Sequence, residues 1–294
     1  MSAELVTIHS DGLTARINPL GAELWSLTDG QGREYMTDAD PAFWTGHAPL
    51  LFPIIGSVAG DRLRIDGHEY VQPRHGFART SRFHVVERGT DRIVFRLTDS
   101  VETRANYPFV FALDMAFRLD GLTLAMEATV NNTGNVPLPF SFGYHPAFAW
   151  PLPGGAPKAA HKLVFEHAEP QAVRRLREAT GLILPEPQPT PVTGRELPLR
   201  EDLFVANALI WDRLSSHSLS YGADGGTWLD IAFPDTSSLG VWQKAGASYI
   251  CIEPWQGHAD PEGFAGDFRE KPGVVLLEPG AARSFRMDVA VRPA

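Results

Sequence analysis

The segment Leu122-Thr-Leu-Ala-Met-Glu-Ala-Thr-Val130 decides the fold class, because its apolar residues fall mainly at every second position. Side chains alternate between the two faces of a β-strand, so such a segment buries one face and exposes the other. The same alternation recurs in residues 92–98 and 284–291. The residues expected on the buried faces are Leu122, Leu124, Met126, Val130, Ile93, Phe95, Leu97, Phe285, Met287, Val289 and Val291.

Turn signals separate these strands along the chain. Residues 218–233 read as a hairpin around Ala223-Asp-Gly-Gly226, and Asn131-Asn-Thr-Gly-Asn135 reads as a turn. Only residues 171–179 resemble a helix. Many short strands with turns every 8–12 residues or so predict an all-β sandwich or barrel-like architecture. The proline-rich stretch from Pro151 to Pro198 is expected to be a surface excursion of a single domain covering residues 1–294.

Composition and charge exclude several classes of function. The chain has 294 residues and a formal net charge of −9, which argues against a nucleic-acid partner. Cys251 is the only cysteine, so neither an intrachain disulfide nor a cysteine-based zinc site can form. The longest apolar run, Pro49–Ile55, is far shorter than the roughly 20 residues of a membrane helix, and the N-terminus does not resemble a secretory signal. We expect a soluble, cytoplasmic protein with no membrane partner.

Three segments combine ionisable side chains with residues that constrain the backbone. They are Arg74-His-Gly-Phe-Ala-Arg79, Ser141-Phe-Gly-Tyr-His-Pro-Ala-Phe148 and Tyr249-Ile-Cys-Ile-Glu-Pro-Trp255. Each segment also has an ordinary structural explanation. The first could be a solvated turn, and the second could hold a core histidine with one hydrogen bond. In the third, the glutamate could lie beyond the end of a strand or pair with a buried arginine. A carboxylate closing an apolar run is nevertheless unusual, because burying it without partners is costly. Together, His75, His145 and Glu253 indicate general acid–base chemistry on a polar organic substrate.

Metal and nucleotide chemistry are weaker interpretations. His75, His145, Glu253 and His258 could supply ligands, but no pair has the i, i+4 spacing of a zinc-binding helix. No glycine-rich phosphate loop and no Gly-x-Ser-x-Gly nucleophile motif occurs. We therefore expect neither a metal nor an organic cofactor.

Five strings of the sequence, taken in order, resemble the aldose 1-epimerase (mutarotase) family, and in particular its LacX-like branch. The resemblance runs from about residue 15 to the C-terminus, and the strings 268–273 and 277–280 fit it too. The five strings are Asn18-Pro-Leu-Gly-Ala-Glu-Leu24, Pro49-Leu-Leu-Phe-Pro-Ile-Ile-Gly56, His75-Gly-Phe-Ala-Arg79, Gly143-Tyr-His-Pro-Ala-Phe148 and Ile252-Glu-Pro-Trp255.

The resemblance implies a large antiparallel β-supersandwich that binds a pyranose in an open cleft. It places the catalytic glutamate on Glu253, the proton-donating histidine on His145 and a substrate-positioning histidine on His75. The aspartate that binds sugar hydroxyls falls on Asp202, with Asn207 as the alternative position.

Ser57 stands where many relatives carry a sugar-contacting arginine, and Arg62 or Arg74 could substitute for it. Trp44, Trp150 and Trp255 could stack on a sugar ring, although a core position is the usual role of such residues.

The expected activity is interconversion of the α and β anomers of an aldose, with Glu253 and His145 opening and reclosing the ring. A related alternative is 1-epimerisation of a hexose 6-phosphate held by Arg74 and Arg79, although the net charge of −9 favours a neutral sugar. The alternative from another class is a sugar-binding protein without turnover. The acid–base pair argues against that class, because binding alone does not need it.

Overall fold

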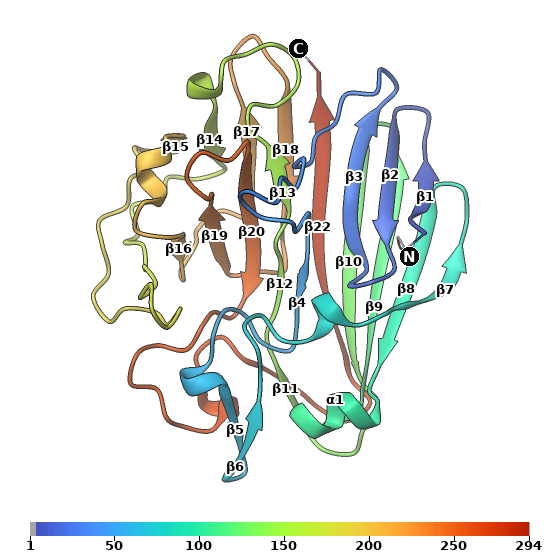
Figure 1. The fold of residues 1–294 in the computed structure, drawn as a ribbon, viewed down its shortest axis with the longest axis vertical. Helices are drawn as coiled ribbons and strands as arrows, with labels where there is room; N and C mark the ends of the chain where they lie inside the picture. Colours follow the sequence, from blue (N-terminus) through green and yellow to red (C-terminus); the bar gives the residue numbers. More distant parts are fainter. Residues whose placement is uncertain (1–3, 294) are drawn as a thin grey trace.

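The fold is built almost entirely from antiparallel strands. A computed structural model describes residues 4–293 (Figure 1). The main element is a nine-stranded sheet. Its order is β15 (Glu196–Pro198), β14 (Lys162–Phe165), β17 (Ser218–Gly222), β18 (Trp228–Ala232), β22 (Ala282–Arg292), β10 (Thr123–Asn132), β9 (Phe111–Asp120), β8 (Arg92–Thr98) and β7 (His84–Arg88).

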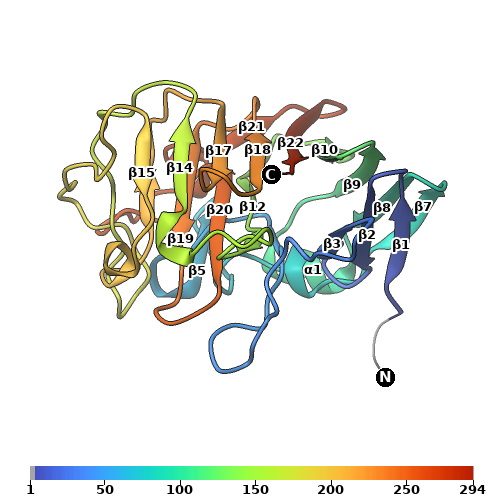
Figure 2. The ribbon, with the colours of Figure 1, turned by 90° about the horizontal axis from the view of Figure 1, so that it is seen from above.

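Two smaller sheets lie against one face of this large sheet (Figures 1 and 2). One has three strands, β1 (Val6–His9), β2 (Leu13–Asn18) and β3 (Glu23–Asp29). The other has six strands, β16 (Leu209–Trp211), β19 (Ser238–Trp242), β20 (Tyr249–Gln256), β12 (Phe142–Tyr144) and β4 (Leu50–Leu51), with β13 (Ala147–Ala149) paired to β20. Two short ribbons complete the set, β11 (Leu138–Phe140) with β21 (Val275–Leu277), and β5 (Arg62–Ile65) with β6 (His68–Val71).

Helical structure is scarce. Helix α1 (Val101–Asn106) begins at a capping box formed by Ser100 and Thr103, and no helix within residues 4–293 is long and apolar enough to cross a membrane. The remaining helices are single 3-10 turns: η1 (Ala59–Asp61), η2 (Ala78–Thr80), η3 (Lys158–Ala160), η4 (Glu201–Phe204) and η5 (Phe268–Glu270).

The all-β prediction is confirmed, and most of the expected strands form. Segments 92–98 and 284–291 lie in β8 and β22, and the hairpin expected at 218–233 is β17 and β18. Segment 122–130 lies in β10 except for Leu122, which is exposed in the turn before the strand. The alternation of apolar residues therefore predicts where the strands lie, but it predicts their ends less well.

The helix expected at residues 171–179 is wrong. This stretch is extended: Val173 and Arg174 form bridges to Gln188 and Ile210, and a turn follows at residues 178–180. Partners distant in the sequence satisfy the backbone groups that a helix would have paired locally. The proline-rich excursion around it supplies β14 and β15 to one edge of the large sheet. One hydrophobic cluster spans all three main sheets, which supports our proposal of a single domain.

The interface between the two layers fixes strand β12. Phe142 of β12 stacks on Phe285 of β22 with ring centroids 5.2 Å apart. The buried Tyr144 hydroxyl donates to the carbonyl of Phe285 at 2.8 Å and accepts from the amide of Ala128 at 3.0 Å. Tyr144 therefore ties β12 to the two central strands of the large sheet, one residue before His145.

We predict that Tyr144→Phe lowers the free energy of unfolding by about 1–3 kcal/mol, because it leaves buried backbone groups without their partner. Chemical denaturation followed by tryptophan fluorescence measures the change. Tyr70→Phe is the matched control, since Tyr70 on β6 is only half-buried and its hydroxyl makes no hydrogen bond within residues 4–293. Equal stabilities for the two variants would show that the Tyr144 hydroxyl does not anchor β12.

Candidate active site

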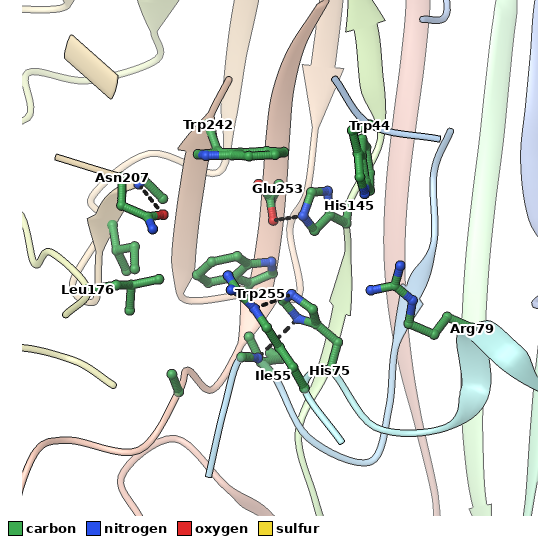
Figure 3. A pocket seen from close by; sticks show the side chains of 15 residues that line it. Trp44, Ile55, His75, Arg79, His145, Leu176, Asn207, Trp242, Glu253 and Trp255 are labelled. Atoms are coloured by element: carbon green, nitrogen blue, oxygen red, sulfur yellow. Dashed lines mark hydrogen bonds and ion pairs between the residues drawn. The ribbon is translucent and has the colours of Figure 1, made fainter. Parts of the chain in front are cut away.

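A cavity of about 270 Å³ opens over the six-stranded sheet, and β20 supplies its central residues (Figure 3). Alternation along β20 directs Ile250 and Ile252 into the main core, and places Glu253 and Trp255 on the opposite face at the cavity. The cavity is lined by Trp44, Ile55, Gly56, Arg74, His75, Arg79, His145, Leu176, Asn207, Ala208, Ile210, Trp242, Glu253, Trp255 and Ala259.

The indole of Trp255 lies across two glycines on neighbouring strands. Gly143 of β12 and Gly240 of β19 pair with residues of β20, and a Cβ atom on them would come within 2.5 Å and 2.6 Å of the indole. Both positions therefore need glycine for the ring to lie against the sheet. The indole nitrogen is buried and has no hydrogen-bond partner within residues 4–293.

His145 and Glu253 meet at the centre of the cavity. His145 Nε2 lies 3.2 Å from Glu253 Oε2, and the side chains are only 9% and 2% exposed. Trp44 covers the imidazole with ring centroids 5.0 Å apart. Within residues 4–293, neither Glu253 Oε2 nor His145 Nδ1 has a partner that meets hydrogen-bond geometry. The pair is in contact and retains unused hydrogen-bonding capacity.

Burial sets the protonation of this pair. It raises the pKa of Glu253 well above the ordinary carboxyl value, against the opposing charge of Arg74. It also lowers the pKa of His145 to about 3, helped by the positive charges of Arg79 and Arg74. Both shifts disfavour the charged forms, so a proton held between the two groups favours the carboxyl over the imidazole.

His75 is held by an unusual backbone and by one amide. Its φ of 69° is in the left-handed region, and the next residue must be glycine because a Cβ atom on Gly76 would overlap the carbonyl of Phe52. The amide of Gly56 donates to His75 Nδ1 at 3.1 Å. Burial, followed by the charges of His145 and Arg74, lowers the pKa of His75 well below its ordinary value. We therefore assign a neutral ring.

Arg74 and Arg79 bring positive charge to the cavity. Arg74 Nε lies 3.2 Å from His75 Nε2, and both guanidinium groups are more than 4.0 Å from every carboxylate within residues 4–293. Arg62 instead lines a separate small hollow beside η5. Ser57 is buried beneath Gly181 and is not among the cavity residues. Of the two arginines considered in place of the one missing at Ser57, only Arg74 reaches the cavity.

The structure brings together six of the seven expected site residues, and Asp202 is the exception. Asp202 lies on η4, where its side chain is 66% exposed and pairs with Arg200 at 3.0 Å. Asn207, five residues further on, lines the cavity with a left-handed φ of 69°. Of the two positions considered for the hydroxyl-binding residue, Asn207 lines the cavity and Asp202 does not.

The structure places two tryptophans differently from what the sequence predicts. Trp150, considered as a stacking residue, is buried in the main core, and its indole donates to the carbonyl of Lys158. Trp242, which sequence reasoning missed, closes the cavity opposite Trp255 (Figure 3). The alternation of β19 could have found it, because Trp242 lies two residues beyond Gly240 on the same face.

One group of donor atoms could be considered for a metal. Atoms of His145, Cys251 and Glu253 lie within 4.8 Å of one another. Burial raises the pKa of the Cys251 thiol well above its ordinary value, which opposes the thiolate that metals bind. His258, named earlier as a potential ligand, is not a cavity residue and contacts the carbonyl of Ala259. The residues present favour proton transfer over metal binding.

Comparison with known proteins places the chain in a family. The aldose 1-epimerase family model matches residues 4–263. The plasmid-encoded protein LacX of Lactococcus lactis subsp. lactis is 30% identical over 295 residues, covering 97% of this chain and 99% of that protein.

Two solved structures share the fold closely. A galactose mutarotase related enzyme from Lactobacillus acidophilus is 29% identical with a TM-score of 0.89, covering 98% of this chain and 97% of that one. A galactose mutarotase-like protein from Lactobacillus casei is 27% identical with a TM-score of 0.90, covering 98% and 100%. The fold is thus galactose mutarotase-like, and the chain belongs to the aldose 1-epimerase family.

Proposed function

We propose that the protein is an aldose 1-epimerase that interconverts the α and β anomers of an aldose. The observation that carries this proposal is the buried contact between His145 and Glu253, 3.2 Å apart in a cavity that accommodates a small polar ring. Anomer exchange requires one proton to leave the C1 hydroxyl and another to reach the ring oxygen. A pair that shares one proton supplies the base and the acid together.

Ring opening begins with the proton on His145 and the charge on Glu253. Proton transfer across their contact produces this arrangement, and the nearby Arg74 charge favours the carboxylate. Glu253 then takes the proton of the C1 hydroxyl while His145 protonates the ring oxygen. The bond between C1 and the ring oxygen breaks, and a C1 carbonyl forms.

Reclosure uses the same two groups with their roles exchanged. In the open-chain state Glu253 holds the proton and His145 is neutral, which is the distribution that burial favours. After rotation about C1–C2, Glu253 returns a proton to the carbonyl oxygen and His145 takes one from the attacking hydroxyl. The other anomer results, and the protein regains its starting state.

The surrounding residues orient the sugar. Trp255 offers its indole to the apolar side of the ring, as aromatic residues do for partly apolar ligands. Arg74 presents guanidinium donors to the cavity, and its Nε donates to His75 Nε2 at 3.2 Å. Asn207 lines the cavity on the side opposite Arg79 (Figure 3) and is our proposed hydroxyl-binding residue.

A second candidate is 1-epimerisation of a hexose 6-phosphate. The observation that favours it is the pair Arg74 and Arg79, which face the cavity without a carboxylate partner within residues 4–293. Unpaired guanidinium groups suit an anionic substituent. The same catalytic pair would act at C1, so the two candidates differ only in the substrate.

We predict that the protein accelerates the approach of fresh α-galactose or α-glucose to anomeric equilibrium, and that Glu253→Gln lowers kcat/KM by about 10²–10⁴-fold. Polarimetry measures both rates against buffer. Glu278→Gln, an exposed change of the same chemistry, is expected to leave the rate unchanged.

Glucose 6-phosphate is assayed in parallel. A response to the phosphate alone would favour the second candidate. Binding of a sugar in calorimetry without any acceleration would contradict catalysis and favour a sugar-binding protein.

The pH profile gives an independent prediction. The pair is active with one proton, so kcat/KM falls on the acidic side only when a second proton binds and on the alkaline side when the shared proton is lost. Because the pKa of His145 is lowered to about 3 and that of Glu253 is raised, the rate should not fall near the ordinary histidine pKa of 6.5. Polarimetry in one buffer series, with the buffer rate subtracted, tests this. An acidic limb centred near 6.5 would contradict the proposed proton sharing.

A further inference from the structure

A buried ion pair lies behind one wall of the cavity and takes no part in the proposed proton transfer. Lys271 Nζ donates to Asp260 Oδ1 at 3.0 Å, and the two side chains are 0% and 4% exposed. Within residues 4–293 Lys271 forms an ion pair with no other carboxylate. Taking two charges out of water costs about as much as their attraction returns, so stability alone does not explain this pair.

The second carboxylate oxygen of Asp260 holds a turn of the backbone. Asp260 Oδ2 accepts from the amide of Ala59, the first residue of η1, at 2.9 Å. The amide of Asp260 in turn donates to the carbonyl of Ser57 at 2.9 Å. Because Lys271 occupies one oxygen and Ala59 the other, the carboxylate can adopt only one orientation. Asp260 therefore fixes both ends of the segment 57–59.

This segment follows directly on the residue that holds His75. The amide of Gly56 donates to His75 Nδ1 at 3.1 Å, and the amide of His75 donates to the carbonyl of Gly56 at 2.8 Å (Figure 3). A Cβ atom on Gly56 would come within 2.5 Å of the Cβ atom of Ala259, the neighbour of Asp260. Gly56, His75 and Ala259 all line the cavity. The position of Asp260 thus reaches the imidazole of His75 through a short, closely packed stretch of backbone.

The carbonyl of Asp260 supports a second part of the same wall. It accepts from the amide of Ile183 at 2.9 Å, and Ile183 forms a bridge to Leu176, which lines the cavity. Asp260 and Lys271 are not themselves cavity residues. The backbone and side chain of Asp260 therefore tie together cavity-lining segments without contacting the space that a ligand would occupy.

We propose that Asp260, held in place by Lys271, is a positioning residue that sets the location of the His75 imidazole through the segment 56–59. This inference deepens the proposed epimerase and rests on that function, in which His75 is expected to position the sugar. Glu253 and His145 lie on other strands, so losing the tie should weaken sugar binding and leave the proton-transfer step intact. KM should therefore rise while kcat is unchanged.

Asp260→Asn tests the tie with little change of shape. An asparagine can satisfy Lys271 or the amide of Ala59 through its single oxygen, but not both. We expect KM for galactose or glucose, measured by polarimetry, to rise by about tenfold, the order expected for one hydrogen bond to a charged group. Glu169→Gln is the matched control, because Glu169 is 0% exposed and accepts backbone amides outside the cavity. It should lower stability in chemical denaturation and leave KM unchanged.

Two further variants separate positioning from stability. Ala59→Pro removes the N–H that Asp260 accepts and keeps the ion pair, and proline suits the first position of a helical turn. The same rise in KM is expected, so this variant keeps the test open if Asp260→Asn does not fold. Combining Asp260→Asn with Lys271→Met frees the asparagine oxygen for Ala59. KM should then return close to the wild-type value even though the protein is less stable.

The outcomes separate this inference from the function on which it rests. Wild-type KM in Asp260→Asn or Ala59→Pro, or a rise in KM that Glu169→Gln shares, would overturn the inference and leave the epimerase proposal standing. If wild-type protein turns over no sugar, the epimerase proposal fails, and amide hydrogen exchange decides the positioning claim. Faster exchange at the amides of Gly56 and His75 in either variant, with Glu169→Gln unchanged there, supports it. Unchanged exchange at both amides overturns it.

Discussion

The burial of Glu253 against His145 is the constraint on which the rest of the site depends. A lone buried carboxylate is costly, and burial here shifts the pKa values of the two groups in opposite directions, which is the basis of our proposal that they share a single proton. Apolar neighbours maintain this state, since Trp44, Tyr249 and the protonated Cys251 surround the pair. In the proposed function, the donors around the cavity act on this proton and on the sugar atoms that exchange it.

The six-stranded sheet positions Glu253 and His145 with little contribution from flexible loops. Alternation along β20 aims Glu253 and Trp255 at the cavity, and Gly143 and Gly240 leave room for the indole between neighbouring strands. Tyr144 ties the strand before His145 to the large sheet. Catalytic geometry must be held within fractions of an ångström, and side chains on paired strands meet that requirement better than side chains on free loops.

The fold class could be predicted from the sequence, and so could the residues at the centre of the candidate site, because both depend on local patterns. Alternation revealed the strands, and the oddity of a glutamate closing an apolar run pointed to Glu253 before any family was considered. It failed where tertiary contacts decide the outcome. Residues 171–179 pair with distant partners and do not form a helix, and the loop after η4 turns Asn207 toward the cavity and Asp202 toward solvent.

A double-mutant cycle on Glu253 and His145 tests most directly whether the two residues act as one proton-sharing unit. The mutarotation rates of the wild-type protein, Glu253→Gln, His145→Gln and the double variant would be measured by magnetisation exchange between the anomeric protons of an equilibrated sugar. Residues that act as a unit are strongly non-additive. The double variant should therefore be no slower than the slower single variant. Losses that multiply in the double variant, or a single variant that keeps the wild-type rate, would contradict the account.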